Sequence, residues 1–264
     1  NIFKYNDDYN IMGIPSYFSH IIKNHRQIIK NVNSVSNVQN LYLDCNSIIY
    51  DSVYKLQKLY QDKNQFESLI IKEVYNILIS YIEHLMPKKI FVAFDGVAPI
   101  AKLQQQRERR FKSQFFNELY ELENIKSTSL WNTIAITPGT EFMEKLHNEF
   151  NNFTAKVKTK FSFLKEAIFS SWKEPGEGEH KIFEYIRKNN HQNETTFVYG
   201  LDADLIMLSI CHLKYCNNLY LYRETPEFIK SIDSSLEPNE SYILDINYLG
   251  EQIYCLLKNN INAT

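Results

Sequence analysis

The stretch from Pro175 to His180 has the sequence Pro-Gly-Glu-Gly-Glu-His, so two carboxylates lie between glycines. The glycines permit a close backbone turn, and the apolar spacing from His180 to Arg187 predicts a helix directly after it. Two acids two positions apart on a regular helix point about 200° away from each other, so both face one ion only if Glu177 is still in the loop. The stretch is a candidate metal site. The alternative is a solvated glycine-rich turn whose acids favour the helix dipole.

Four aspartates at the ends of predicted strands extend this candidate site. With the two glutamates they make six carboxylates, Asp44, Asp95, Glu177, Glu179, Asp202 and Asp204. Acids packed at that density without cations would raise one another's pKa, so hard divalent ions, Mg²⁺ by default, are the natural occupants. Two ions about 4 Å apart would activate a water and stabilise the leaving oxygen in phosphodiester hydrolysis. For any single aspartate at a strand end, a helix cap or turn former is the commoner role.

A one-sided basic helix is predicted immediately after the strand that ends at Asp95. At about 100° per residue, four side chains fall within an arc of roughly 100°, while Glu108 points elsewhere. They are Lys102, Gln106, Arg109 and Arg110. Arginine forks and a lysine point charge suit a phosphate. A charge run on a helix is usually only solvated surface, but the position next to Asp95 favours a phosphate site beside the metals.

Three further features are weaker candidates. Tyr50 is a candidate to stack on a base, although in a chain with 18 tyrosines packing is the commoner role for any one of them. His180 is either a ligand or phosphate contact or, more commonly, a cap. Cys211 and Cys216 flank His212 after an apolar helix, and we interpret them as buried thiols.

Alternating strands and helices must position these residues. Apolar segments that end in an acid predict buried strands from Leu41, Lys89 and Thr196, and helices are predicted at 48–60, 66–85 and 205–211. The alternation indicates an α/β fold with a mostly parallel central sheet flanked by helices. The carboxyl ends of such strands lie at one edge of the sheet, so the acids are expected to converge there.

The remaining segments complete the predicted domain. They are an amphipathic segment from Met12 to about Ile29, a loop at 31–39, a helix at 101–122, a strand from Trp131 to Thr137, a turn at 138–140 that opens a helix from Glu141, and strands at 219–222 and 242–245 separated by a loop with Pro226 and Pro238. Pro87 stops the helix before the second strand. We expect residues 1–11 to be a flanking segment and residues 12–264 to form one domain.

Composition narrows the class of protein. The 264 residues carry a net charge of −2, with 44% hydrophobic and 23% charged residues, which is typical of a globular protein with a sizeable core. The four cysteines show no zinc or disulfide spacing, which favours an intracellular protein, cytoplasmic or nuclear. No run of 18 apolar residues and no signal-peptide pattern is present, so no membrane partner is expected.

At this point the chain resembles the XRN-type 5′→3′ exoribonucleases, in their N-terminal nuclease domain. The matching segments occur in the family's order and extend over nearly the whole chain from Met12. They are Met-Gly-Ile-Pro-Ser-Tyr-Phe from Met12, Leu-Tyr-Leu-Asp-Cys-Asn-Ser-Ile-Ile from Leu41, Asp-Gly-Val-Ala-Pro from Asp95 with the helix from Lys102 to Phe111, Thr-Pro-Gly-Thr-Glu-Phe-Met from Thr137, Glu-Pro-Gly-Glu-Gly-Glu-His-Lys-Ile from Glu174, and Tyr-Gly-Leu-Asp-Ala-Asp-Leu-Ile-Met-Leu from Tyr199.

The resemblance implies a PIN/FEN-like α/β nuclease domain that removes mononucleotides from single-stranded RNA with a 5′-monophosphate, as in mRNA decay, using two Mg²⁺ or Mn²⁺ ions. By motif position, the six carboxylates would be metal ligands and hold the catalytic ions. Lys102, Gln106, Arg109 and Arg110 would form the 5′-phosphate pocket.

The chain departs from the family pattern in ways that keep alternatives open. Tyr50 stands where the family has a base-stacking His. The segment from Tyr242 to Leu257 resembles the stretch before the family's last metal-binding Asp, and the chain ends at Thr264 without that motif or the C-terminal segments that follow it. A missing C-terminal segment or a protein partner would then complete the site. The alternatives are a catalytically impaired RNA-binding remnant and a FEN-like DNA nuclease.

Overall fold

The computed structural model describes residues 17–122, 131–189, 191–224, 230, 234–237 and 240–261. The flanking segment, the first five residues of the motif that begins at Met12, and Pro226 and Pro238 lie outside these residues. The chain divides into two compact units, one of residues 37–188 and one of residues 1–36 with 189–264. The single domain expected for residues 12–264 stays a prediction.

Three parallel strands form the centre of the unit 37–188. β2 (Asn40–Asp44) and β4 (Glu166–Ser170) lie on either side of β3 (Lys89–Ala93), and Asp44 is aligned with Ala93, which is aligned with Ser170. The main chain continues this alignment past the strands, because Cys45 N–H donates to Ala93 O and Phe94 N–H donates to Ser170 O, both at 2.9 Å. The carboxyl ends of all three strands therefore form one edge.

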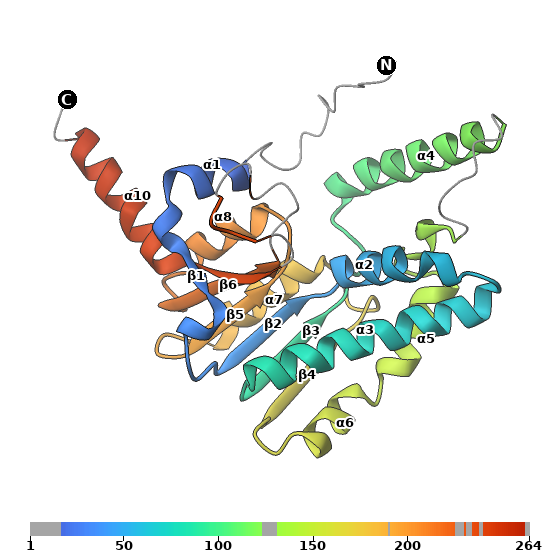
Figure 1. Cartoon of the computed structure of the whole chain (residues 1–264), viewed down its shortest axis with the longest axis horizontal. Helices are drawn as coiled ribbons and strands as arrows, with labels where there is room; N and C mark the ends of the chain where they lie inside the picture. The colour runs from blue at the N-terminus through green and yellow to red at the C-terminus, as the bar shows by residue number, and fades with distance from the viewer. Residues whose placement is uncertain are drawn as a thin grey trace. The chain divides into compact units, whose positions relative to one another are not determined.

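Helices connect and flank these strands (Figure 1). They are α2 (Asn46–Leu56), α3 (Lys63–Leu85), α4 (Ile100–Leu122), α5 (Glu141–Phe150), α6 (Phe153–Lys160) and α7 (Gly178–Asn189), with short 3-10 turns η3 (Gln57–Leu59) and η4 (Thr133–Ala135). The Asp62 side chain accepts a hydrogen bond from Gln65 N–H and caps α3, which ends at Met86 in a left-handed conformation just before Pro87. The face of α3 at spacings of four residues is fully buried, as expected for an amphipathic helix, at Phe66, Ile70, Val74, Leu78 and Ile82.

The second unit holds four strands in the order β1-β7-β6-β5. β5 (Thr195–Tyr199) pairs parallel with β6 (Asn218–Glu224), whereas β7 (Ser241–Asp245) pairs antiparallel with β6 and with β1 (Ile29–Asn31). The flanking elements are α1 (Tyr17–Asn24), η1 (Arg26–Ile28), η2 (Val32–Ser34), α8 (Asp204–Cys211) and α10 (Ile246–Ile261). The core includes Ile28, Phe197, Leu219, Leu221, Leu244 and Leu249.

The predicted α/β fold with mostly parallel strands and flanking helices is confirmed, while the predicted strand from Trp131 to Thr137 is wrong. This segment forms the turn η4, where the Asn132 side chain accepts a hydrogen bond from Ile134 N–H. The Thr140 hydroxyl donates to the carbonyls of Ala135 and Thr137, so side chains take up main-chain groups that a strand would have paired.

Several elements were not predicted from the sequence. β1 begins where the predicted amphipathic segment ends, η2 lies in the predicted loop at 31–39, and β4, α6 and α10 had no prediction. β4 is the clearest case, because its sequence Glu-Ala-Ile-Phe-Ser is short and polar at both ends. It forms a strand because β3 offers a paired edge, which is a tertiary cause.

Candidate metal centre

Two aspartates are positioned by the parallel strands. Asp44 is the last residue of β2, and Asp95 follows β3 by two residues. Asn46, at the start of α2, fixes the second aspartate from both sides. Its Nδ2 donates to Asp95 Oδ2 at 2.6 Å, and Asp95 N–H donates back to Asn46 Oδ1 at 3.1 Å. Both carboxylates therefore lie at the edge formed by the strand ends.

The glycine-rich turn is fastened to the loop after β3. Gly176 has a φ of +100°, its N–H donates to Val97 O at 2.9 Å, and it accepts from Gly96 N–H at 2.9 Å. A Cβ on Gly96 would lie 1.8 Å from Glu174 O, so only glycine allows the two loops to approach this closely. The turn thus delivers Glu177 to the strand edge.

The start of α7 faces both aspartates. Gly178 N–H donates to Asp95 Oδ1 at 2.7 Å, and a Cβ on Gly178 would lie 2.5 Å from Asp44 Oδ1. Glu177 directly precedes the helix and Glu179 is inside its first turn. This arrangement, with the first acid before the helix and the second inside it, is the one that lets two acids two positions apart face one ion.

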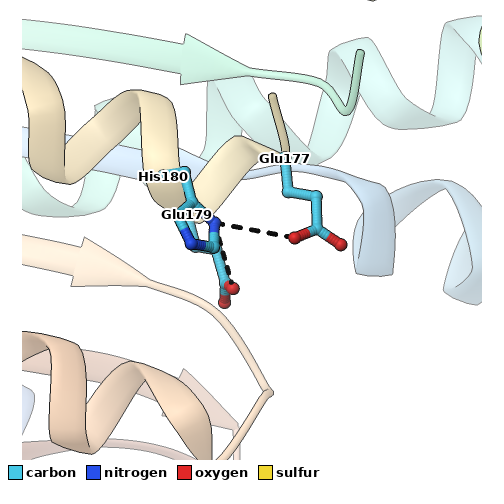
Figure 2. Close-up of side chains that lie close together, drawn as sticks. All are labelled: Glu177, Glu179 and His180. Carbon is cyan, nitrogen blue, oxygen red and sulfur yellow. Dashed lines mark ion pairs between the residues drawn. The ribbon is translucent and has the colours of Figure 1, made fainter. Parts of the chain in front are cut away.

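Glu177, Glu179 and His180 form the only group of three or more possible metal-ligating side chains within 4.8 Å of one another in the described part of the chain. His180 Nδ1 lies 3.6 Å from Glu177 Oε2 and 3.4 Å from Glu179 Oε1 (Figure 2). Glu179 is buried, whereas His180 is exposed. Carboxylate oxygens with one imidazole suit a hard or borderline divalent cation.

Burial shifts the pKa of two ionisable side chains at this edge, Asp95 and Lys181. It raises the pKa of Asp95, and the charge of Glu177 adds to the shift, while the Gly178 N–H and the ammonium groups of Lys181 and Lys102 oppose it. Burial also lowers the pKa of Lys181 to about 8. The Lys181 ammonium donates to Phe94 O at 2.8 Å and Ser171 O at 2.7 Å, and so holds the ends of β3 and β4 together beneath the acids.

One basic residue of α4, Lys102, contacts the acids at this edge. Lys102 Nζ lies 2.6 Å from Glu177 Oε2 and 3.8 Å from Glu179 Oε1. Further along, Arg110 donates to Gln106 Oε1 at 3.2 Å, while Glu108 accepts from Gln104 at 3.2 Å. Lys102 therefore links the basic face of α4 to the acids, and its predicted role as a phosphate ligand stays a prediction.

Tyr50 on α2 lies near the same residues. Burial and the charge of Asp95 raise the pKa of its phenol, and Arg110 and Arg109 lower it. The side chain is 47% exposed, so one part of the ring is accessible to a ligand.

Asp202 and Asp204 belong to the other unit. Asp202 follows β5, and Asp204 is the first residue of α8, with its N–H donating to Asp202 Oδ1 at 3.3 Å. Arg223 on β6 donates to Leu201 O at 3.1 Å, and burial lowers its pKa to about 10. The structure therefore brings Asp44, Asp95, Glu177, Glu179 and Lys102 together in the unit 37–188. Asp202 and Asp204 lie in the other unit.

Sequence reasoning missed Asn46, Lys181 and Arg223. Asn46 had a usable signal, because an Asn after a strand that ends in Asp is a common helix-start residue. Lys181 looks like a solvated charge on an amphipathic helix, and Arg223 like an ordinary strand residue. No local pattern reveals that either is buried.

The fold and the acids define an α/β protein with carboxylates at the ends of its parallel strands. The chain belongs to the XRN 5′-3′ exonuclease family, because the model of the N-terminal region of that family matches residues 12–225. The suspected resemblance is thereby confirmed.

Relatives in three organisms show the same similarity. The chain is 36% identical to the 5′-3′ exoribonuclease 1 of Saccharomyces cerevisiae in an alignment of 262 residues, gaps included, that covers 91% of this chain and 17% of that protein. It is 35% identical to the Schizosaccharomyces pombe protein of the same name, over 92% of this chain and 19% of that protein. The human 5′-3′ exoribonuclease 1 is 35% identical over 75% of this chain and 12% of its own length. The chain thus spans less than a fifth of each of these relatives. Among the described residues, no helix is long and apolar enough to cross a membrane.

Proposed function

We propose that this chain is the nuclease part of a 5′→3′ exoribonuclease that removes mononucleotides from single-stranded RNA with a 5′-monophosphate. The observation that carries this proposal is the set of carboxylates around Gly178, with the basic helix α4 starting beside it. The family and the names of the relatives supply the direction and the substrate.

We infer that Asp44, Asp95, Glu177, Glu179, Asp202 and Asp204 hold two ions, Mg²⁺ or Mn²⁺. The donor set fits, since hard cations prefer carboxylate oxygens and Glu177 and Glu179 already converge on the Lys102 ammonium. When bound, such ions lower the pKa of a water and neutralise charge on the leaving oxygen. The Gly178 N–H and Asn46 keep Asp95 in a fixed orientation for this role.

The 5′-phosphate is assigned to Lys102, Gln106, Arg109 and Arg110. Two arginine forks about two turns along the same helix from a lysine can surround a terminal phosphate with charge-assisted hydrogen bonds. Tyr50, which is half exposed on α2, is assigned to stack on the first base. An RNA with a 5′-hydroxyl would leave the cations without their anion, so it should be a poor substrate.

The test is digestion of a labelled single-stranded RNA that bears a 5′-monophosphate or a 5′-hydroxyl, with Mg²⁺, Mn²⁺ or EDTA. We expect mononucleotides from the 5′-monophosphate RNA only, in either metal, and none from an Asp202→Ala and Asp204→Ala double variant. Glu83→Ala, which removes a 52% exposed carboxylate on α3, is the matched control and should keep full activity.

The same assay separates the alternatives. Binding that depends on the 5′-phosphate and weakens in Arg109→Ala, without any cleavage, would mean an RNA-binding remnant or a site that needs a further segment or protein. Cleavage of flapped DNA in preference to RNA would instead mean a FEN-like DNA nuclease.

A further inference from the structure

A cavity of about 620 Å³ lies in the unit 37–188, and none of the carboxylates of the metal centre lines it. It is formed where the start of α3 meets the turn η4 and the start of α5. Its lining combines acids, one lysine and three aromatic rings, including Tyr60, Lys63, Glu67, Trp131, Glu141 and Phe142. Neither the family match nor the proposed nuclease activity assigns a role to it.

Glu67 is a buried acid in the lining of this cavity, with 1% of the residue exposed. Its Oε2 lies 2.6 Å from Lys145 Nζ, which also donates to Asn64 Oδ1 at 2.9 Å. Its Oε1 is buried and accepts no hydrogen bond from any residue that the structure describes. Native proteins rarely leave a buried carboxylate oxygen without a donor, so this atom points to a ligand group that donates a hydrogen bond.

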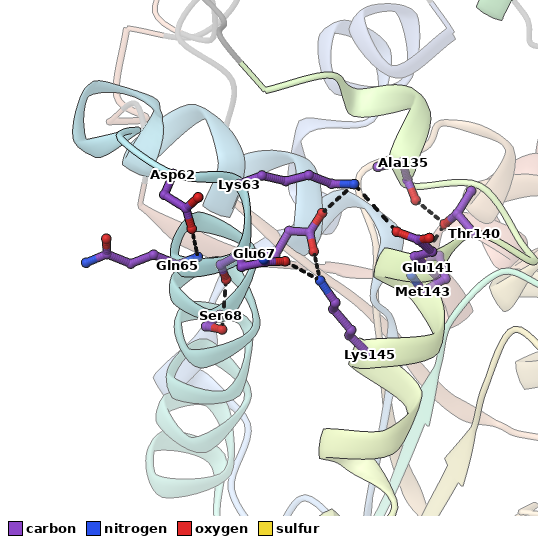
Figure 3. Close-up of polar contacts among 11 residues, drawn as sticks. Asp62, Lys63, Gln65, Glu67, Ser68, Ala135, Thr140, Glu141, Met143 and Lys145 are labelled. Atoms are coloured by element: carbon purple, nitrogen blue, oxygen red, sulfur yellow. Dashed lines mark hydrogen bonds and ion pairs between the residues drawn. The ribbon is translucent and has the colours of Figure 1, made fainter.

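Lys63 does not fulfil that role. Its Nζ lies 4.0 Å from Glu67 Oε1 and 3.6 Å from Glu141 Oε2, beyond hydrogen-bond distance of both (Figure 3). The Lys63 side chain is 57% exposed and that of Glu141 is 83% exposed, so this lysine can swing out at little cost. Two carboxylate oxygens then face the same space from α3 and α5.

Aromatic rings form a wall of the cavity beside these acids. The aromatic residues of the lining are Tyr60, Trp131 and Phe142. Trp131 packs edge-on against Phe142 at 5.0 Å between centroids. Phe66, which is not part of the lining, supports Tyr60 and Trp131 at 5.1 and 6.0 Å. A flat cation next to such rings gains cation–π attraction as well as apolar contact. The cavity therefore suits a group that is planar, positively charged and rich in N–H donors.

We propose that this cavity binds a guanidinium group, presented by an arginine side chain of a partner protein. Guanidinium is planar, weakly hydrated and forked, so it can donate to Glu67 Oε1 and Glu141 Oε2 together while resting on the aromatic wall. An ammonium is a poorer fit, since the ammonium of Lys63 is already there and hydrogen-bonds to neither oxygen. This binding is separate from the nuclease chemistry.

The experiment is a titration followed by the indole N–H signals of the two tryptophans, Trp131 in the cavity and Trp172 outside it. The probes are N-acetyl-arginine methylamide, its lysine and citrulline counterparts, and guanosine. We expect the arginine compound to shift the Trp131 signal saturably and to leave Trp172 unchanged, with weaker effects from the lysine compound and weaker still from neutral citrulline.

Variants test the two acceptors and the competing lysine. Glu67→Gln should weaken arginine binding about tenfold or more, because a hydrogen bond to a buried charge is lost. Glu141→Gln, at a residue too exposed to affect folding, should weaken it about two- to fivefold. Lys63→Ala should tighten it, which a purely structural role of these residues would not produce. Glu83→Gln is the control and should leave binding unchanged.

Three results would overturn the proposal. They are equal shifts with the arginine and lysine compounds, a Trp131 shift with guanosine but not with arginine, and no saturable shift with any probe in the wild type and in Lys63→Ala. The first would make the cavity a general cation site, the second a nucleobase site, and the third a closed structural ion pair.

Discussion

Adding one methyl group at Gly178 should displace a proposed metal ligand, although no charged residue is replaced. A Cβ at this position would lie 2.5 Å from Asp44 Oδ1, which is 0.9 Å short of the 3.4 Å at which ordinary contact begins, and 3.3 Å from Ala93 O. Ala93 belongs to β3 and is held by its pairing with β2 and β4. The carboxylate of Asp44 is therefore the group that has to move.

The expected effects of Gly178→Ala follow from that displacement. A misplaced ligand typically lowers metal affinity about 10- to 100-fold, and overpacking of this size costs about 1–3 kcal/mol of unfolding free energy. The assay is Mn²⁺ binding followed by the paramagnetic resonance of the free ion, with thermal unfolding of the same samples in EDTA.

Gly139→Ala is the matched control. Gly139 has a φ of +90° and its added Cβ would contact only the Trp172 ring at 3.9 Å, so this variant should lose stability through backbone strain yet keep its Mn²⁺ affinity. Unchanged Mn²⁺ affinity in Gly178→Ala, together with a loss in Asp44→Ala, would refute the placement of Asp44 against Gly178.

Three further outcomes are expected. Lys102→Met should tighten Mn²⁺ binding measured without RNA, because a competing ammonium 2.6 Å from Glu177 is removed, and should weaken binding of 5′-phosphorylated RNA in a filter assay. Lys181 has a pKa of about 8 in the folded chain, below its ordinary 10.5, so between these pH values the unfolded chain binds more protons than the folded chain. In denaturation measured as a function of pH, the wild type should therefore gain stability relative to Lys181→Met as the pH rises from about 8 to 10.5. Arg223→Met should cost about 1–3 kcal/mol in urea unfolding, because it removes the donor to Leu201 O and the guanidinium that lies 3.9 Å over the Phe18 ring.

The parts of the fold that could be predicted are those with a strong local signal. The strands ending near Asp44 and Asp95 are short, apolar and bounded by an acid, and both are fully buried over most of their length. The position of Glu177 outside α7 is the one that helix geometry requires if Glu177 and Glu179 are to face one ion. By contrast, the segment from Trp131 to Thr137 has strand-like composition but becomes a turn, because Trp131 packs between Phe66 and Phe142.

The sequence predicted individual residues of the candidate site only where the side chain itself can bind a metal or a phosphate. Carboxylates and arginines are recognisable in sequence, whereas Asn46 and Lys181 act through main-chain and side-chain contacts that exist only after folding. The role of Lys102 shows the same limit. Its place on the basic face of α4 was predicted, but its ion pair with Glu177 depends on how the loop at 174–178 packs against the loop after β3.

That ion pair explains how the acids can be tolerated without a metal. Glu177 and Glu179 would repel each other at this separation, and the Lys102 ammonium offsets part of that repulsion at 2.6 and 3.8 Å. A divalent cation bound by the same oxygens supplies twice the charge and would expel the ammonium by like-charge repulsion. Lys102 would then be released toward Gln106 and Arg110 on its own helix. Binding of the metal and binding of a terminal phosphate should therefore reinforce each other, because the metal displaces the Lys102 ammonium from the acids and the phosphate binds that same ammonium.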